Sequence, residues 1–370
     1  MDRYFETRDL AVGYHGKILI HDINVAIEKG RILTLIGPNG AGKSTILKSI
    51  TKQLAAIAGT VCIDGQQIGK WSVKDMARQV AVVLTQRIQP ELMTCAEVVA
   101  MGRYPYTNML GRLTPRDREA VQEALERVHG RELADQDFMT LSDGQKQRIM
   151  LARAICQEPE VIVLDEPTAY LDIRHKIELL DILRQMAREK QITVIMSLHE
   201  IDLASKISDY LLCVKGETIA AFGPPEEILK ADTIKKLYDL DKGSYNLLFG
   251  SVELARPQGT PSTFVVAGGG FGIPCYRALQ RKNVPFATGV LYENDVDFPV
   301  AKELGSHVIS APAFEPMGEE QFREAAGLLC TCTQVIDAGT PVGSLNGFNG
   351  RLLALAREKK IPVHGADSIL

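Results

Sequence analysis

The sequence lacks several features that would place the protein in other classes. No apolar run approaches the roughly 20 residues that a membrane-spanning helix needs, so any role at a membrane is expected to come through partners. The first residues, Met1–Leu10, are polar and charged and are not typical of a secretory signal. The formal net charge is -4, so the chain has no overall basic field and no nucleic-acid partner is predicted.

Cysteine is sparse and scattered. The seven cysteines form no even, regularly spaced set, so we predict no disulfide framework and a reducing compartment. Cys330 and Cys332 form a C-x-C pair, but no histidines stand beside them at the spacing of a zinc site. The pair is therefore interpreted as two ordinary thiols.

What the sequence does contain is the profile of a folded protein. Hydrophobic residues make up 45% and charged residues 24% of 370 residues, a size typical of two domains. Near-continuous apolar runs predict a sheet covered on both faces, with strands at Arg31–Ile36, Ala81–Leu84, Val161–Leu164 and Thr193–Met196. Helical patterns cover Ser44–Thr51, Pro115–Val128, Gly144–Cys156, His175–Glu189 and Glu200–Ser205. Ahead of these, Leu10–Tyr14 and Ile18–Ile27 predict antiparallel strands around a turn at His15–Gly16.

A composition shift near residue 250 predicts a second domain. Residues 255–262 are rich in proline, glycine and small polar residues, as in a linker. Strand and helix patterns then start afresh, which predicts domains at 1–254 and 263–370. The second has the size and pattern of a small Rossmann-like α/β domain, either regulatory or dimerising.

A phosphate-binding loop follows the strand Arg31–Ile36 and opens a helix. It matches G-x-x-x-x-G-K-[ST] and consists of Gly37, Pro38, Asn39, Gly40, Ala41, Gly42, Lys43, Ser44 and Thr45. Glycines let backbone amides surround phosphates, and the helix N-terminus adds positive partial charge. Lys43 is expected to reach the β- and γ-phosphates, and the Ser44 hydroxyl to bind Mg²⁺.

Two carboxylates end the apolar strand Val161–Leu164. Because ligands bind at the carboxyl ends of strands in such sheets, Asp165 and Glu166 predict part of the same site. Asp165 is placed to hold the magnesium through water, and Glu166 to polarise an attacking water.

Together with these motifs, Leu141–Gln145 (LSDGQ) makes residues 3–250 resemble the ABC-type ATPases. The resemblance implies an antiparallel β subdomain, a RecA-like core and a helical signature subdomain. It assigns Gln86 to the Q-loop, as a ligand of the magnesium and the water, and His199 to the γ-phosphate. Other roles it implies are adenine stacking by Tyr14, a D-loop at Asp172, and a signature made by Ser142, Gly144 and Gln145.

The family signature also implies a mechanism. Its serine and glycine amides face the γ-phosphate bound by the other subunit, so two copies of the chain form a head-to-tail dimer around two ATP molecules. This chain has Asp143 where glycine is commonest. Asp is favourable at a helix N-terminus, but its charge repels a triphosphate, so we expect Asp143 to point away.

Within the family, residues 97–113 resemble the ATPases of importers for ferric siderophores, haem or cobalamin. The resemblance implies a peripheral subunit at the cytoplasmic face of the membrane, with permease subunits docking near Met93–Leu113 and a binding protein as indirect partner. Exposed apolar residues are expected there, namely Met101, Tyr104, Tyr106, Met109 and Leu110. The alternative for this segment is a locally buried helical face. The alternative for the whole protein is a soluble regulatory ATPase switch.

Three loops of the second domain follow predicted strands. They are Gly268–Gly272, the acids Glu293, Asp295 and Asp297, and residues 337–343, which begin with Asp337. Such loops can line one ligand crevice, although Ile273 stands where the third glycine of a dinucleotide fingerprint would be needed. A small-molecule ligand at Gly268–Gly272, Glu293 and Asp337 is one hypothesis. The other is a packing or dimerisation domain with ordinary turns.

Overall fold

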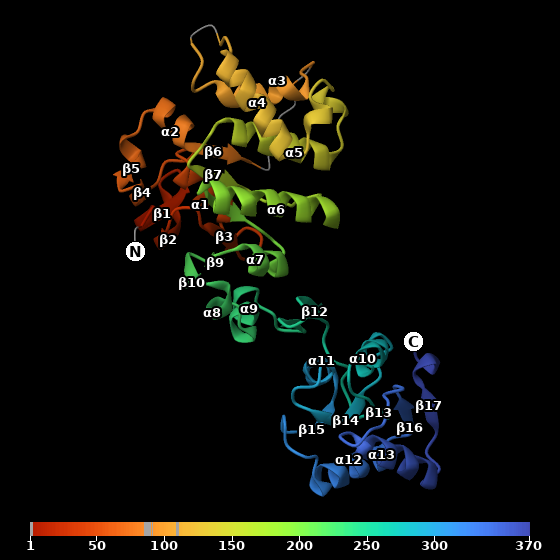
Figure 1. Cartoon of the computed structure of the whole chain (residues 1–370). Helices are drawn as coiled ribbons and strands as arrows, with labels where there is room; N and C mark the ends of the chain where they lie inside the picture. The colour runs from red at the N-terminus through yellow and green to blue at the C-terminus, as the bar shows by residue number, and fades with distance from the viewer. Residues whose placement is uncertain (1–2, 85–89, 91, 109–110) are drawn as a thin grey trace. The chain divides into compact units, whose positions relative to one another are not determined.

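A computed structural model describes residues 3–84, 90, 92–108 and 111–370 (Figure 1). The chain divides into two compact units, Met1–Thr233 and Ile234–Leu370, and each has its own sheets and core. The domain boundaries expected at 1–254 and 263–370 stay a prediction. Residues 255–262 contain no helix or strand.

An antiparallel sheet opens the first unit. Its strand order is β2-β1-β4-β5, with β1 (Phe5–Tyr14), β2 (Lys17–Ile27), β4 (Ala58–Ile63) and β5 (Gln66–Gln67). The predicted turn between β1 and β2 is present, and His15 and Gly16 take φ values of 51° and 77° there. These left-handed values suit a tight hairpin turn. The short helix η1 (Ile68–Lys70) follows β5.

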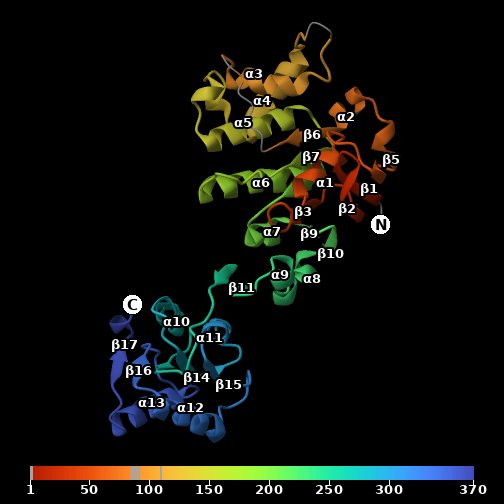
Figure 2. The ribbon, with the colours of Figure 1, turned by 180° about the vertical axis from the view of Figure 1, so that it is seen from behind.

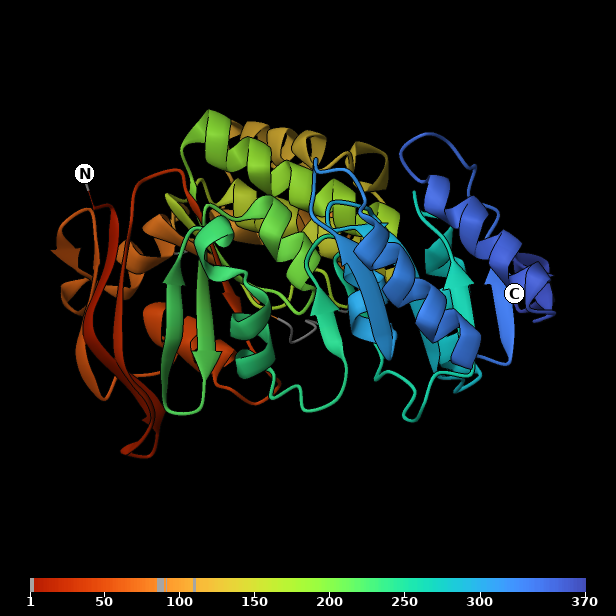
Figure 3. The same ribbon diagram turned by 90° about the horizontal axis from the view of Figure 1, so that it is seen from below.

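A six-stranded sheet forms the centre of the first unit. Its order is β10-β9-β3-β8-β7-β6, with β10 (Thr218–Gly223), β9 (Tyr210–Lys215), β3 (Ile32–Ile36), β8 (Thr193–Ser197), β7 (Val161–Leu164) and β6 (Val80–Val83). All neighbours pair in parallel except β10. Its helices are α1 (Lys43–Ile50), α2 (Val73–Gln79), α6 (Ile173–Lys190) and α7 (Ile201–Ile207), followed by α8 (Pro225–Ile228) (Figures 2 and 3). Helix α9 (Ala231–Leu237) contains the boundary between the two units. Because β3, β7 and β8 run in parallel, the loops after them meet at one edge.

A helical group lies beside the β6 end of this sheet, as Figures 1 and 2 show. It contains α3 (Cys95–Ala100), α4 (Pro115–Arg127) and α5 (Asp143–Cys156), with the short helices η2 (Met101–Arg103), η3 (Arg131–Leu133) and η4 (Phe138–Thr140). Helices α3, α4 and α5 each begin with a capping box, formed by Thr94, Thr114 and Ser142 with the residue three positions later. These pairs satisfy amides that a helix start leaves open, which fixes where each helix begins.

The capping carboxylate of α4 predicts an acid-dependent stability. Asp117 is buried, and hydrogen bonds from Thr114 and from the Arg103 guanidinium, working against burial, lower its pKa to about 2. A lowered pKa stabilises the fold above pH 4, and this stabilisation is lost as the pH falls towards 2. Asp117→Asn is expected to lower the melting temperature of the first unit by about 2–4 °C or more at pH 7. The difference from the wild type should shrink below pH 4 in thermal melts, and a constant difference would contradict the argument.

The second unit has a five-stranded parallel sheet covered on both faces. Its order is β15-β14-β13-β16-β17, with β15 (His307–Ala311), β14 (Phe286–Tyr292), β13 (Thr263–Val266), β16 (Gln334–Asp337) and β17 (Val363–Gly365). Helices α10 (Gly272–Arg281) and α11 (Phe298–Leu304) pack on one face, and α12 (Glu319–Thr331) and α13 (Gly347–Glu358) pack on the other (Figure 1). The hairpin β11 (Ser244–Asn246) and β12 (Ser251–Glu253) precedes this sheet, and η5 (Ala366–Ser368) ends the unit. The predicted Rossmann-like arrangement is confirmed.

Candidate functional site

The loop between β3 and α1 has the backbone that a phosphate loop requires. Gly37 has a φ of 149°, and a Cβ there would lie 2.2 Å from the carbonyl oxygen of Val214. Only glycine therefore lets the chain leave β3 at this angle. The Lys43 Nζ curls back over the loop and donates to the carbonyl oxygens of Gly37 and Pro38 at 2.7 and 3.0 Å. Burial lowers the pKa of Lys43, while the nearby Glu166 and Asp165 carboxylates oppose the shift.

A cavity of about 460 Å³ opens over this loop. Its walls bring together residues from four separate places in the chain, namely Tyr14, Leu19, Asn39, Gly40, Gly42, Lys43, Ser44, Thr45, Glu166 and His199. Tyr14 is 45% exposed, and its hydroxyl lies 3.3 Å from the Thr45 Oγ1. An exposed aromatic face beside a cationic loop can stack on a purine whose phosphates lie on the loop amides.

Hydroxyl and carboxylate oxygens gather at the carboxyl ends of β7 and β8. Ser44 and Ser197 both donate to the Asp165 Oδ1, at 3.0 and 2.8 Å, and the Glu166 amide donates to the Ser197 Oγ at 2.9 Å. Oxygen donors of this kind suit Mg²⁺, which is typically bound by one or two carboxylates together with substrate phosphates. Among the described residues no group of three or more His, Cys, Asp or Glu could hold a metal ion.

Ser197 is a site residue that sequence analysis missed. The available signal was a polar residue at the end of the buried strand β8, beside the strand that ends in Asp165. Strand pairing, which sets Leu164 opposite Met196, places the two side chains together.

Glu166 and His199 form a pair at the wall of the cavity. The His199 Nε2 lies 2.7 Å from the Glu166 Oε1, and both side chains keep some exposure to solvent. Glu166 takes a left-handed φ of 50°, which turns the chain sharply after β7. A partly exposed carboxylate next to an imidazole can orient a water and accept its proton. Gln86, expected to join this pair, lies outside the described residues.

The signature residues lie together but do not line the cavity around Lys43. Ser142 caps α5, with its Oγ accepting from the Gln145 amide at 3.3 Å. A Cβ on Gly144 would lie 3.1 Å from the His175 ring, and Asp172 accepts from the His175 amide and Nδ1 at 2.9 and 2.8 Å. His175, which sequence analysis placed only as a helix residue, thus joins the predicted D-loop to the signature.

Comparisons with known proteins agree with this geometry. Residues 20–169 match the family described as ABC transporter, and residues 286–368 match the MJ0874 family. The chain is 42% identical over 287 residues to an uncharacterized ABC transporter ATP-binding protein, MJ0873, of Methanocaldococcus jannaschii, covering 77% of this chain and 99% of the relative. The chain belongs to the ATP-binding proteins of ABC transporters. As an ABC ATPase it binds ATP with Mg²⁺ and hydrolyses it to ADP and phosphate.

Two further relatives carry transport names. The ABC ATPase is 37% identical to the iron(3+)-hydroxamate import ATP-binding protein FhuC of Bacillus subtilis, covering 64% of this chain and 87% of the relative. It is 30% identical to the cobalamin import ATP-binding protein BtuD of Halobacterium salinarum, covering 93% and 87%. Among solved structures, cbiO1 from Clostridium perfringens matches with a TM-score of 0.55 and 27% identity, covering 64% of this chain and 94% of that one. These matches confirm the predicted ABC fold.

The region predicted to receive a permease is part exposed and part buried in the ABC ATPase. Tyr104 is 61% exposed, whereas Met101 and Tyr106 are half-buried. Met109 and Leu110 lie outside the described residues. Of the three described residues in this set, Tyr104 has the most exposed side chain.

The glycine loop of the second unit already pairs its amides with carboxylates. Asp295 accepts from the Gly269 amide at 2.9 and 3.0 Å, and Asp297 accepts from the amides of Gly272 and Ile273 at 2.9 and 3.1 Å. These amides are the donors that a phosphate would use at the start of α10. Elsewhere in the predicted crevice, Asp337 accepts from the Gly339 amide at 2.9 Å, and Glu293 is partly exposed. The amides of Gly269, Gly272 and Ile273 are therefore already paired within the chain.

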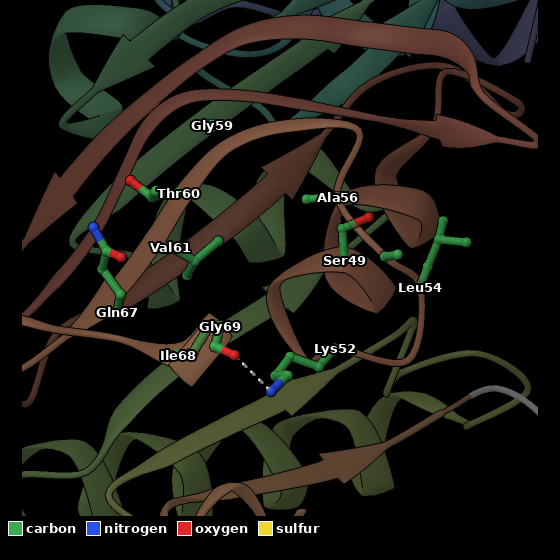
Figure 4. A pocket seen from close by; sticks show the side chains of 11 residues that line it. Ser49, Lys52, Leu54, Ala56, Gly59, Thr60, Val61, Gln67, Ile68 and Gly69 are labelled. Carbon is green, nitrogen blue, oxygen red and sulfur yellow. Dashed lines mark hydrogen bonds between the residues drawn. The ribbon is translucent and has the colours of Figure 1, made fainter. Parts of the chain in front are cut away.

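A second cavity of about 340 Å³ lies between the end of α1 and the antiparallel sheet. Figure 4 shows Ser49, Leu54 and Ala56 on one side of it and Gly59, Thr60 and Val61 on the other, with Lys52 donating to the carbonyl oxygen of Gly69. None of the residues predicted to bind nucleotide lines this cavity, so it is separate from the ATP site.

The shared acceptor at Asp165 predicts a magnesium-dependent defect. Asp165→Ala removes the carboxylate that Ser44 and Ser197 both contact, so the Mg²⁺ concentration giving half-maximal ATP hydrolysis should rise about tenfold or more. Titration of Mg²⁺ at fixed ATP measures this. Asp181→Ala, on the exposed side of α6, is the matched control and should behave as the wild type. An unchanged Mg²⁺ requirement in Asp165→Ala would contradict the assignment.

Proposed function

We propose that this protein is the ATPase subunit of an importer for a metal chelate of the siderophore, haem or cobalamin class. The single observation that carries the proposal is the ATP site, in which the Lys43 loop, Asp165, Glu166 and His199 meet in one cavity. The import relatives supply the cargo class. The protein would act at the cytoplasmic face of the membrane as a peripheral subunit, with a binding protein as an indirect partner. Among the described residues no helix is both long and apolar enough to cross a bilayer.

In the proposed reaction, Lys43 and the loop amides bind the phosphates, and Tyr14 stacks on adenine. Ser44 and Asp165 hold Mg²⁺, which neutralises phosphate charge when bound. Glu166 orients the attacking water and accepts its proton, while His199 holds the Glu166 carboxylate and contacts the γ-phosphate. We also assign Gln86 to the magnesium and the water.

The position of the signature supports a head-to-tail dimer. Ser142, Gly144 and Gln145 do not reach the cavity of their own chain, so we propose that they contact ATP bound by a second copy. Asp172 would shape the contact between the copies. ATP then holds two chains together, hydrolysis releases them, and this cycle drives the permease.

For the second unit we retain two roles, a regulatory domain or a dimerising one. The pairing of Asp295 and Asp297 with the amides of the glycine loop counts against an anionic ligand on those amides and leaves dimerisation open. A small molecule at Gly268–Gly272, Glu293 and Asp337 would instead support regulation.

The permease contact predicts a strong effect of charge at an exposed aromatic residue. Tyr104→Glu places a carboxylate in the middle of the proposed docking segment, Met93–Leu113, and should abolish co-purification with permease subunits from membranes. Val73→Glu, at an exposed apolar residue of α2 outside this segment, is the control and should still co-purify. Absence of any permease with the wild-type protein would instead support a soluble regulatory ATPase.

A further inference from the structure

Arg103 is a buried cation at the end of η2. Its side chain is 2% exposed. The Nε donates to the Asp117 Oδ1 at 2.8 Å, and the Nη1 donates to the carbonyl oxygen of Cys156 and to the Glu158 Oε2, both at 2.7 Å. A buried guanidinium is tolerated only when its donors are paired, and these acceptors come from α4, from the last residue of α5 and from the turn after it.

The backbone beside Arg103 is equally close to α5. A Cβ on Gly102 would lie 2.3 Å from the carbonyl oxygen of Arg153, so the chain touches the helix with no room for a side chain. The segment predicted to receive a permease is thus fastened to the C-terminal end of the helix whose N-terminal end carries the signature.

Tyr106 extends these contacts towards the central sheet, and we call the group of Arg103, Tyr106, Gln157 and Glu158 the junction. Its ring lies 4.1 Å from the Arg103 guanidinium, and its hydroxyl donates to the carbonyl oxygen of Gln157 at 3.0 Å. The Gln157 side chain donates in turn to the carbonyl oxygens of Ala77 and Val80, at 2.5 and 2.8 Å. Val80 is the first residue of β6.

Three elements that lead to ATP-site motifs meet at this junction. Helix α5 begins at the signature residue Ser142. Strand β7 follows the turn at Gln157 and Glu158 and ends before Asp165 and Glu166, and β6 runs along the chain towards Gln86. A displacement of the segment around Arg103 would therefore reach all three through buried and partly buried hydrogen bonds.

We propose that Arg103 and Tyr106 are positioning residues that transmit permease contact to α5 and β6 and so set the rate of ATP hydrolysis in the assembled transporter. The inference rests on the proposed function, because it requires a permease on this segment. Neither residue lines the nucleotide cavity, so neither acts on ATP directly.

The test compares ATPase activity with and without the permease. Tyr106→Phe removes only the hydroxyl that bonds to Gln157 and keeps the ring beside Arg103. For the isolated protein, kcat and the KM for ATP should stay within about twofold of wild type. In the complex with its permease in lipid vesicles, stimulation of the ATPase should fall about fivefold, the effect of one lost hydrogen bond. Tyr210→Phe removes a hydroxyl that donates to the Glu28 Oε2 at 3.0 Å, outside this segment, and should keep full stimulation.

A second variant is expected to reduce the stimulation by the permease further. Arg103→Lys keeps the charge opposite Asp117 but cannot form the forked contacts to Cys156 and Glu158, so it should lower stimulation further. Loss of stimulation in a Tyr106→Phe protein that still co-purifies with the permease, and melts at the wild-type temperature, would support the inference. Wild-type stimulation in that complex would overturn it. Failure of the wild-type protein to bind any permease would overturn the proposed function, and this inference with it.

Discussion

Glu166→Gln is expected to reduce ATP turnover by about a hundredfold or more while ATP still binds. The amide that replaces the carboxylate keeps the size of the side chain and can still contact His199, but it cannot accept a proton from water. The loop that holds the phosphates is untouched, since Lys43 and Ser44 lie on α1 and Glu166 follows β7. The variant should therefore bind ATP normally but hydrolyse it very slowly.

A stalled reaction should also trap the dimer. With Mg²⁺ and ATP, size-exclusion chromatography should show Glu166→Gln as a dimer, whereas the wild type should return to a monomer as ATP is consumed. Glu189→Gln, on the exposed end of α6, changes an equivalent carboxylate away from the site and should match the wild type in both assays. Unchanged phosphate release from Glu166→Gln would remove Glu166 from the role of base.

Mixed dimers should separate one shared pocket from two independent ones. When one protomer carries Lys43→Ala and its partner carries Ser142→Asp, both lesions fall in the same pocket and the other pocket stays intact. Such a dimer should keep one working pocket and still hydrolyse ATP. When a single protomer carries both lesions and its partner is wild type, every pocket has one lesion, and ATP hydrolysis should be nearly lost.

The choice of Ser142→Asp keeps the fold constant. Asp is as good a helix cap as Ser, so α5 should still begin at the same residue. The charge of Asp would, however, repel the γ-phosphate of the ATP that the other protomer binds. Both mixed dimers contain the same two substitutions and differ only in their distribution. The rate of phosphate release measures the outcome, and equal rates in the two arrangements would refute a head-to-tail dimer.

Much of the fold was predictable because strong local signals agreed. The apolar runs of the central sheet became β3, β6, β7 and β8 within one residue at each end. Helices α4 and α5 also lie within one residue of the ranges expected, and Thr114 and Ser142 cap them through residues only three positions away. Strand order was not predictable, because any of several pairings would bury the same apolar residues.

The ATP site was predictable where a motif is local. The loop from Gly37 to Thr45 needs only its own backbone and the start of α1, so its residues could be named from the sequence. Ser197 and His175 could not, since each becomes functional only through a neighbour more than 30 positions away, Asp165 for the first and Gly144 for the second.

The amino-acid sequence by itself determined that this protein binds a nucleoside triphosphate, because close phosphate contact demands glycines, a lysine and a hydroxyl at fixed spacing. Tertiary structure alone decided which side chains finish that site, and that the carboxylates of Asp295 and Asp297 cover the loop amides of the second unit. The physical reason is that hydrogen bonds between distant segments depend on how strands pair and helices pack. A linear pattern does not specify either one.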